Sequence, residues 1–180
     1  PLASDLDSLA RGGPERVERE FKEVMESRVA GGSDEDAAQA YGTKKVYSSK
    51  LELARDMSLS PEKPFVFVML HAFNDHPHSH YGPMLFRDYY DWFAQTLRFA
   101  WDFPDVNWLF KEHPSADWYP TRDVRVADSF QGSPDHVLFL PKDADFSTRS
   151  LFHVADAVVT VAGTAGVEVP ASASVPSILA

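Results

Sequence analysis

The chain contains no cysteine among its 180 residues. Disulfide bonds and thiolate metal sites are therefore excluded, and a reducing compartment is permitted. Basic residues are also in short supply, because 17 Lys and Arg stand against 27 Asp and Glu, for a formal net charge of −10. Since Lys and Arg form no cluster, the chain is not expected to bind the backbone of a nucleic acid. An anionic ligand would need a local positive site.

Long apolar runs are absent too. No run approaches the roughly 20 residues of a membrane-spanning helix, and no signal peptide is visible, so we expect a cytoplasmic protein. The sequence also lacks a P-loop, the spaced glycines of a dinucleotide fingerprint and the chain order of a Ser/His/Asp triad. The chain begins at Pro1, and residues 177–180 resemble the interior of a buried strand, which indicates a fragment of a longer protein.

The first third of the chain has a helical pattern. Residues 14–29 place apolar side chains at helical spacing and are followed by a Gly-Gly pair, which predicts a helix. Ser33 predicts the start of a second short helix. After a stretch without a clear pattern, residues 58–64 have the composition of a linker. We therefore expect residues 1–60 to form a helical N-terminal segment.

From residue 61 onward, apolar strands alternate with helices. A continuous apolar run is typical of a strand that is covered on both faces of a sheet. Alternation of such strands with helices predicts the α/β class and a doubly wound parallel, Rossmann-like sheet. The expected strands are residues 65–70, 107–110, 136–141, 157–161 and 176–180, and the expected helices are residues 83–103 and 164–172, with a short helix after Ser147.

Gly163–Glu168, directly after a predicted strand, is the strongest local signal for a ligand site. Gly163 and Gly166 allow the backbone to approach a ligand closely, and the amides that begin the next helix attract anions. Glu168 can accept hydrogen bonds from ribose or sugar hydroxyls. The alternative is a tight turn in which Glu168 only complements the helix dipole.

A second polar segment, Lys111–Ser115, follows another predicted strand. We call this segment and Gly163–Glu168 the two polar corners. Lys111 supplies a cation, and His113 supplies an imidazole that Pro114 keeps at the end of the strand. Ligands of open parallel sheets bind at the carboxyl ends of the strands. The two corners together suit a nucleotide, with phosphate on the amides and cations and ribose on the carboxylate. The alternative is a solvated loop with a strand-terminal charge.

A loop rich in histidine follows the first predicted strand. His71 and Asp75 lie nearest the end of that strand and are expected to face the same site as the two corners. The other histidines have no defined helical or strand face and no further ligands at a fixed spacing, so we predict no metal site. They are His76, His78 and His80.

In their order along the chain, these motifs resemble the bacterial capsule polysaccharide biosynthesis family. Its members are surface-carbohydrate glycosyltransferases of GT-B architecture and include the capsule Kdo transferases. The resemblance covers roughly residues 65–180 and departs from the family at residues 172–176, where a glycine is usual. It is carried by Leu70-His71 with Asp75, Phe110–Ser115, Leu140–Asp143 and Ala155–Glu168.

The resemblance implies that residues 61–180 hold a nucleotide-activated donor sugar and that residues 1–60 are the tail of a missing acceptor domain. The donor could be CMP-linked, the acceptor would be a glycan or lipid-linked sugar, and no separate cofactor is implied. Peripheral association with an assembly complex at the inner face of the cytoplasmic membrane is also implied. Catalytic roles are implied for Asp75 and His113. The implied donor-binding residues are His71, Lys111, His113, Pro114, Ser115, Gly163, Thr164, Ala165, Gly166 and Glu168.

Two other readings of the same residues stay open. The first is a GT-B-fold enzyme of different chemistry, such as a nucleotide-sugar epimerase or a glycerophosphate polymerase, which would bind a different donor. The second is a non-catalytic α/β module that scaffolds an assembly complex, which would bind no nucleotide.

Overall fold

The computed structural model describes residues 13–30, 38, 42, 44–74, 85–118, 120–121, 124–161, 163–173 and 175–179. The chain divides into two compact units, Pro1–Thr43 and Lys44–Ala180. The boundary that we expected at residue 60 therefore falls within the second unit. The two units are described separately below.

The first unit contains helix α2, Gly13–Val29, and the predicted helix over residues 14–29 is confirmed. Arg16 and Glu20 form an i,i+4 ion pair on its surface, with 2.6 Å between Nε and Oε1. Along its apolar stripe Met25 is buried, whereas Val17, Phe21 and Val24 are exposed. The second short helix, expected from Ser33 to residue 40, lies outside the described residues except for residue 38.

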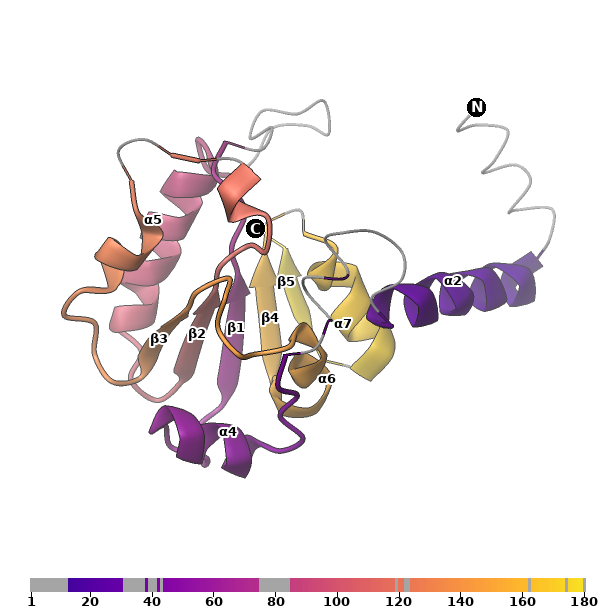
Figure 1. Ribbon diagram of the computed structural model, residues 1–180, viewed down its shortest axis with the longest axis horizontal. Helices are drawn as coiled ribbons and strands as arrows, with labels where there is room; N and C mark the ends of the chain where they lie inside the picture. The colour runs from indigo at the N-terminus through magenta and orange to yellow at the C-terminus, as the bar shows by residue number, and fades with distance from the viewer. Residues whose placement is uncertain are drawn as a thin grey trace. The chain divides into compact units, whose positions relative to one another are not determined.

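The second unit is built on a five-stranded sheet in which every pair of neighbouring strands is parallel. The strands lie side by side in the order β3-β2-β1-β4-β5 (Figure 1). All five strands were predicted, and each observed end lies within one residue of the predicted end. Their bounds are β1 Phe65–Met69, β2 Asn107–Lys111, β3 Val137–Leu140, β4 Ala157–Thr160 and β5 Ser177–Leu179.

Helices and short 3-10 turns connect the strands and cover the sheet. The fold is therefore α/β with a five-stranded, all-parallel sheet flanked by helices, which is consistent with a Rossmann-like arrangement. The helices are α4 Lys50–Met57, α5 Tyr89–Trp101, α6 Leu151–Val154 and α7 Ala165–Ala173, and the 3-10 turns are η1 Ala116–Trp118, η2 Val126–Phe130 and η3 Thr148–Ser150.

Two apolar clusters cover the two faces of the sheet. Because successive side chains of a strand point to opposite faces, Phe67 belongs to one cluster and Val68 to the other. The cluster around Phe67 contains residues of α4, α6 and α7, and the cluster around Val68 contains residues of α5. This two-sided burial explains why β1 reads as an uninterrupted apolar run.

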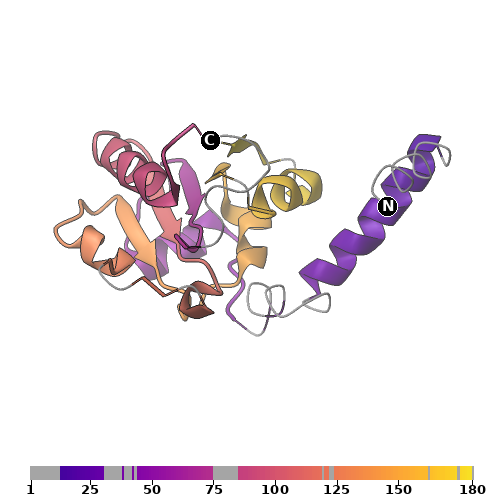
Figure 2. The same cartoon turned by 90° about the horizontal axis from the view of Figure 1, so that it is seen from above.

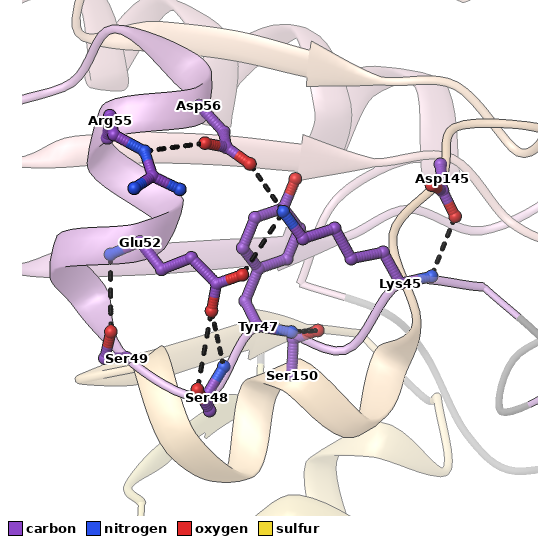
Figure 3. A network of polar contacts seen from close by, with 9 residues as sticks. All are labelled: Lys45, Tyr47, Ser48, Ser49, Glu52, Arg55, Asp56, Asp145 and Ser150. Atoms are coloured by element: carbon purple, nitrogen blue, oxygen red, sulfur yellow. Dashed lines mark hydrogen bonds and ion pairs between the residues drawn. The ribbon is translucent and has the colours of Figure 1, made fainter.

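Residues 44–57 belong to the sheet-containing unit because polar and apolar contacts hold them there. Lys45 Nζ contacts Glu52 Oε1 at 3.2 Å and Asp56 Oδ2 at 2.5 Å, and it lies 4.3 Å from the centre of the Tyr47 ring (Figure 3). The Tyr47 amide donates to Ser150 Oγ at 3.0 Å, next to α6. Tyr47 itself is buried in the cluster that contains Phe67.

Helix α5 begins later than the sequence pattern suggested. We expected it to start near residue 83, but it starts at Tyr89 because the Asp88 side chain caps it. Asp88 Oδ1 accepts a hydrogen bond from the Asp91 amide at 2.7 Å, which satisfies an amide that has no partner within the helix. This start brings the Tyr89 ring to the loop that follows β1, where it stacks on His71.

Candidate functional site

The carboxyl ends of β1 and β4 form the topological switch point of the sheet. From β1 the chain continues to β2 and β3 on one side of β1, whereas β4 and β5 lie on the other side of β1. Ligands of doubly wound folds bind outside the strand ends at such a point. Figure 2 views the molecule from above and looks onto this edge.

The two central strands separate at this edge. The last pair between β1 and β4 is Val68 with Val159. On its other side β1 stays paired with β2 through Met69 and Lys111, and the Leu70 amide still donates to Lys111 O at 2.9 Å. The sheet therefore opens between β1 and β4 and stays closed between β1 and β2.

His71 links the residues that follow three strands. One face of its ring stacks on Tyr89 of α5, with centroids 4.5 Å apart and planes at 17°. The ring of His113, which follows β2, lies 6.2 Å away at 21°. His71 Nε2 is 3.5 Å from the position that a Cβ on Gly163 would occupy. The two polar corners that the sequence singled out, one around His113 and one around Gly163, thus meet at His71.

The orientation of His113 is set by its own loop. The Ser115 amide donates to His113 Nδ1 at 3.2 Å, and Ser115 is buried. The Ala116 amide donates to the main-chain oxygen of His113 at 3.1 Å and closes the turn that begins η1. Because Nδ1 acts as the acceptor, we assign the hydrogen of the neutral ring to Nε2. Pro114, between these residues, is half-buried.

The turn before α7 is compact and has no room for a side chain at Gly163. A Cβ there would lie 2.7 Å from Thr160 Oγ1, closer than real Cβ contacts come. The Gly166 amide donates to Gly163 O at 3.0 Å, and the Glu168 amide donates to Thr164 O at 2.9 Å. Thr164 is exposed, and Ala165, Gly166 and Glu168 are buried. The backbone of Gly163 therefore packs directly against the Thr160 side chain, and its close approach to a ligand stays a prediction.

Lys111 is placed differently from the simple expectation of a cation that faces solvent. Only 5% of the residue is exposed, and its Nζ donates to the main-chain oxygens of Pro141 at 3.0 Å and Glu112 at 3.3 Å. Burial, and then the neighbouring ammonium of Lys44, lower the pKa of Lys111 to about 8. Its side chain is thus held by carbonyl oxygens at the ends of β2 and β3.

Several predicted residues of the histidine-rich loop lie outside the described residues. They are Asp75, His76, His78 and His80. In the part of the chain that the structure describes, no group of three or more His, Cys, Asp or Glu side chains could hold a metal ion.

Two residues of this site were not singled out as ligand-site residues from the sequence. Tyr89 falls within the helix expected over residues 83–103, and its ring supports His71. Thr160 closes the apolar run of β4, and its hydroxyl accepts a hydrogen bond from the Gly163 amide at 3.3 Å. The sequence signal for Thr160 was its hydroxyl at the end of a buried strand, because a buried polar group needs a hydrogen-bond partner.

No protein-family model matches the chain, and no curated protein or solved structure matches it significantly. Among the described residues, no helix has both the length and the apolar character needed to cross a membrane.

Proposed function

We propose that this chain is the donor-binding half of a GT-B glycosyltransferase that builds bacterial surface or capsular polysaccharide. The reaction is glycosyl transfer from a nucleotide sugar, with a CMP-linked acid sugar as one donor class, to a glycan or lipid-linked acceptor. The proposal places the enzyme in the cytoplasm at the inner membrane face. It rests on the resemblance in sequence together with the geometry of the strand ends.

One observation carries the proposal: His71 lies beside both polar corners. Its ring is 6.2 Å from that of His113, and its Nε2 lies against the Gly163 turn. A phosphate at the switch point could therefore meet imidazole N–H groups and the amides that precede α7 together. Such groups stabilise the charge that develops on a leaving phosphate.

In this proposal the charged residues have separate roles. His113 presents its Nε2–H to the phosphate, because Nδ1 is engaged by the Ser115 amide. Two main-chain oxygens hold the Lys111 ammonium at the ends of β2 and β3, and from there it contributes positive charge to the site. Glu168 holds sugar or ribose hydroxyls. Asp75, which follows β1 in the sequence, is proposed as the catalytic base.

A ligand panel tests the proposal with the full chain. Isothermal titration calorimetry with CMP, UDP, a CMP-linked acid sugar and CDP-glycerol should show binding of a sugar nucleotide or its nucleotide. His71→Ala and His113→Ala should each weaken that binding at least about tenfold, since each removes a hydrogen bond to a charged group. His153→Ala, an exposed histidine on α6, is the matched control and should bind as the wild type does.

The same panel separates the alternatives. Selective binding of CDP-glycerol would favour a glycerophosphate polymerase over the proposed glycosyltransferase. Absence of binding to every member of the panel would contradict the proposal and favour a scaffold module. Equal binding by wild type, His71→Ala and His113→Ala would mean that the nucleotide binds elsewhere.

A further inference from the structure

Thr160 is a buried polar residue at the point where β4 leaves β1. It has no exposed surface, and it ends a strand whose other residues are apolar. Its Oγ1 donates a long hydrogen bond to Met69 O at 3.5 Å and accepts one from the Gly163 amide at 3.3 Å. One hydroxyl therefore connects the end of β1 with the turn that precedes α7.

This connection begins where the backbone pairing ends. Val68 and Val159 form the last pair between β1 and β4, so the next residues along, Met69 and Thr160, are joined through the side chain instead. On its other side, Thr160 remains paired with Leu179 of β5. The main chain of Thr160 is thus held by the sheet, and its hydroxyl has a fixed position from which to hold the turn.

The hydroxyl also limits how close the turn can come. A Cβ on Gly163 would lie 2.7 Å from Thr160 Oγ1 and 3.5 Å from His71 Nε2. The bare backbone of Gly163 therefore fits between the Thr160 hydroxyl and the His71 imidazole. A shift of this hydroxyl would change the distance between the turn and the imidazole.

We propose that Thr160 is a positioning residue of the nucleotide site. Its hydroxyl holds the Gly163 turn at the distance from His71 at which the turn amides and the imidazole act on the same phosphate. Thr160 does not itself contact the ligand. This inference rests on the proposed function, because it assigns the residue that sets the geometry of that same site.

The test compares Thr160→Val, which keeps the shape and removes the hydroxyl, with Thr160→Ser, which keeps the hydroxyl. In the full chain, Thr160→Val should shift the amide resonance of Gly163 and speed its hydrogen exchange, and Thr160→Ser should leave both near the wild-type values. Calorimetry with CMP and UDP should show about tenfold weaker binding for Thr160→Val and less than about twofold change for Thr160→Ser. Thr148→Val, at a buried threonine of η3, is the matched control and should bind as the wild type does.

The outcomes separate this inference from the proposed function. If the wild type binds CMP or UDP and Thr160→Val binds equally well, the positioning role is wrong and the proposed function stands. If the wild type binds neither nucleotide nor any other member of the panel, the proposed function fails, and the positioning role fails with it. If Thr160→Val does not fold, the test uses Thr160→Ser together with Gly163→Ala. The new methyl of Gly163→Ala would push the Thr160 hydroxyl away from the turn. Weakened binding in Gly163→Ala with normal binding in Thr160→Ser would then support the role, and unchanged binding in Gly163→Ala would overturn it.

Discussion

Ser177, the first residue of β5, donates a hydrogen bond from its Oγ to the main-chain oxygen of Gly166 in α7, with 2.7 Å between the two atoms. The residue four positions after Gly166 is Pro170, which lies inside this helix and has no amide hydrogen to donate. The serine hydroxyl therefore supplies the hydrogen bond that the proline removes. It also joins α7 to the strand that follows it.

This relationship predicts the effect of removing the hydroxyl. Ser177→Ala should lower the free energy of unfolding by about 1–2 kcal/mol, because a buried carbonyl loses its partner. In a Pro170→Ala background, position 170 supplies its own amide, so the same change should have a smaller effect. Urea denaturation of the two single variants and the double variant measures this coupling. Additive effects would show that the serine does not compensate for the proline.

Lys111 should make stability depend on pH in the alkaline range. Its pKa is about 8 in the folded protein and near 10.5 when unperturbed, so the unfolded chain binds more protons between these values. The free energy of unfolding should therefore rise as the pH rises from 8 to 10.5, by at most about 3 kcal/mol from this group. Denaturation at several pH values measures the slope.

Lys111→Met should flatten that slope, because it removes the buried amine that titrates. Lys142→Met is the matched control. Lys142 follows the neighbouring strand, its ammonium pairs with Asp117 at 2.7 Å, and its pKa is raised. An unchanged slope in Lys111→Met would show that the pKa of this amine is not lowered in the folded protein.

The network around Lys45 should stabilise the fold at neutral pH and lose this effect in acid. The Lys45 ammonium is the main cause that lowers the pKa of Asp56, and it is a secondary cause for Glu52, after the Ser48 amide. Because both carboxyl pKa values are lowered by folding, this stability is present above their unperturbed values and is lost as the pH falls through the lowered values. Lys45→Met should thus lower the melting temperature at pH 7 and change it little at pH 2.

Thermal melts of Lys45→Met at both pH values check this expectation. Lys22→Met on α2 is the control, since its contact with Glu26 is 3.9 Å long between exposed side chains and should contribute almost nothing. An equal loss of melting temperature for Lys45→Met at the two pH values would rule out the ionic contribution.

Gly163→Ala should disturb the candidate site directly. The new methyl would lie 2.7 Å from Thr160 Oγ1 and 3.5 Å from His71 Nε2, so the hydroxyl or the turn must move. We expect a loss of stability of about 1–3 kcal/mol, as for other overpacked positions, and a shift of the His71 ring resonances. Thr164→Ala, at the exposed next residue, should change neither. Wild-type resonances in Gly163→Ala would show that the turn is not packed against the imidazole.

Sequence patterns located most elements of the sheet-containing unit because their causes are local. Each strand is built around a continuous apolar run, and α7 begins at the expected glycine turn. Helix α4 was not predicted because it spans only eight residues, and charged residues interrupt its apolar side chains. Its start depends on the side-chain cap at Ser49. Only Leu53 and Ala54 of this helix are buried, so its pattern is weak.

The sequence predicted which residues lie at the candidate site, and that they share one edge of the sheet, but not their side-chain contacts. It indicated His71, His113 and Gly163 because polar and small residues after buried strands are unusual, and because parallel strands end at the same edge. It did not indicate the stacking of Tyr89 on His71 or the contact of Thr160 with Gly163, since these depend on where a helix starts and where two strands separate. The burial of Lys111 against main-chain oxygens also depends on the neighbouring strand.

By itself, the sequence determined that the chain forms alternating strands and helices with polar corners after the strands, because hydrophobic periodicity, caps and turns act over a few residues. Only the tertiary structure decided the strand order, and with it which corners become neighbours. That order places β4 beside β1 and brings residues about 90 positions apart, such as His71 and Gly163, within reach of one another. Its physical cause is the packing of helices on both faces of the sheet, which no local stretch of sequence contains.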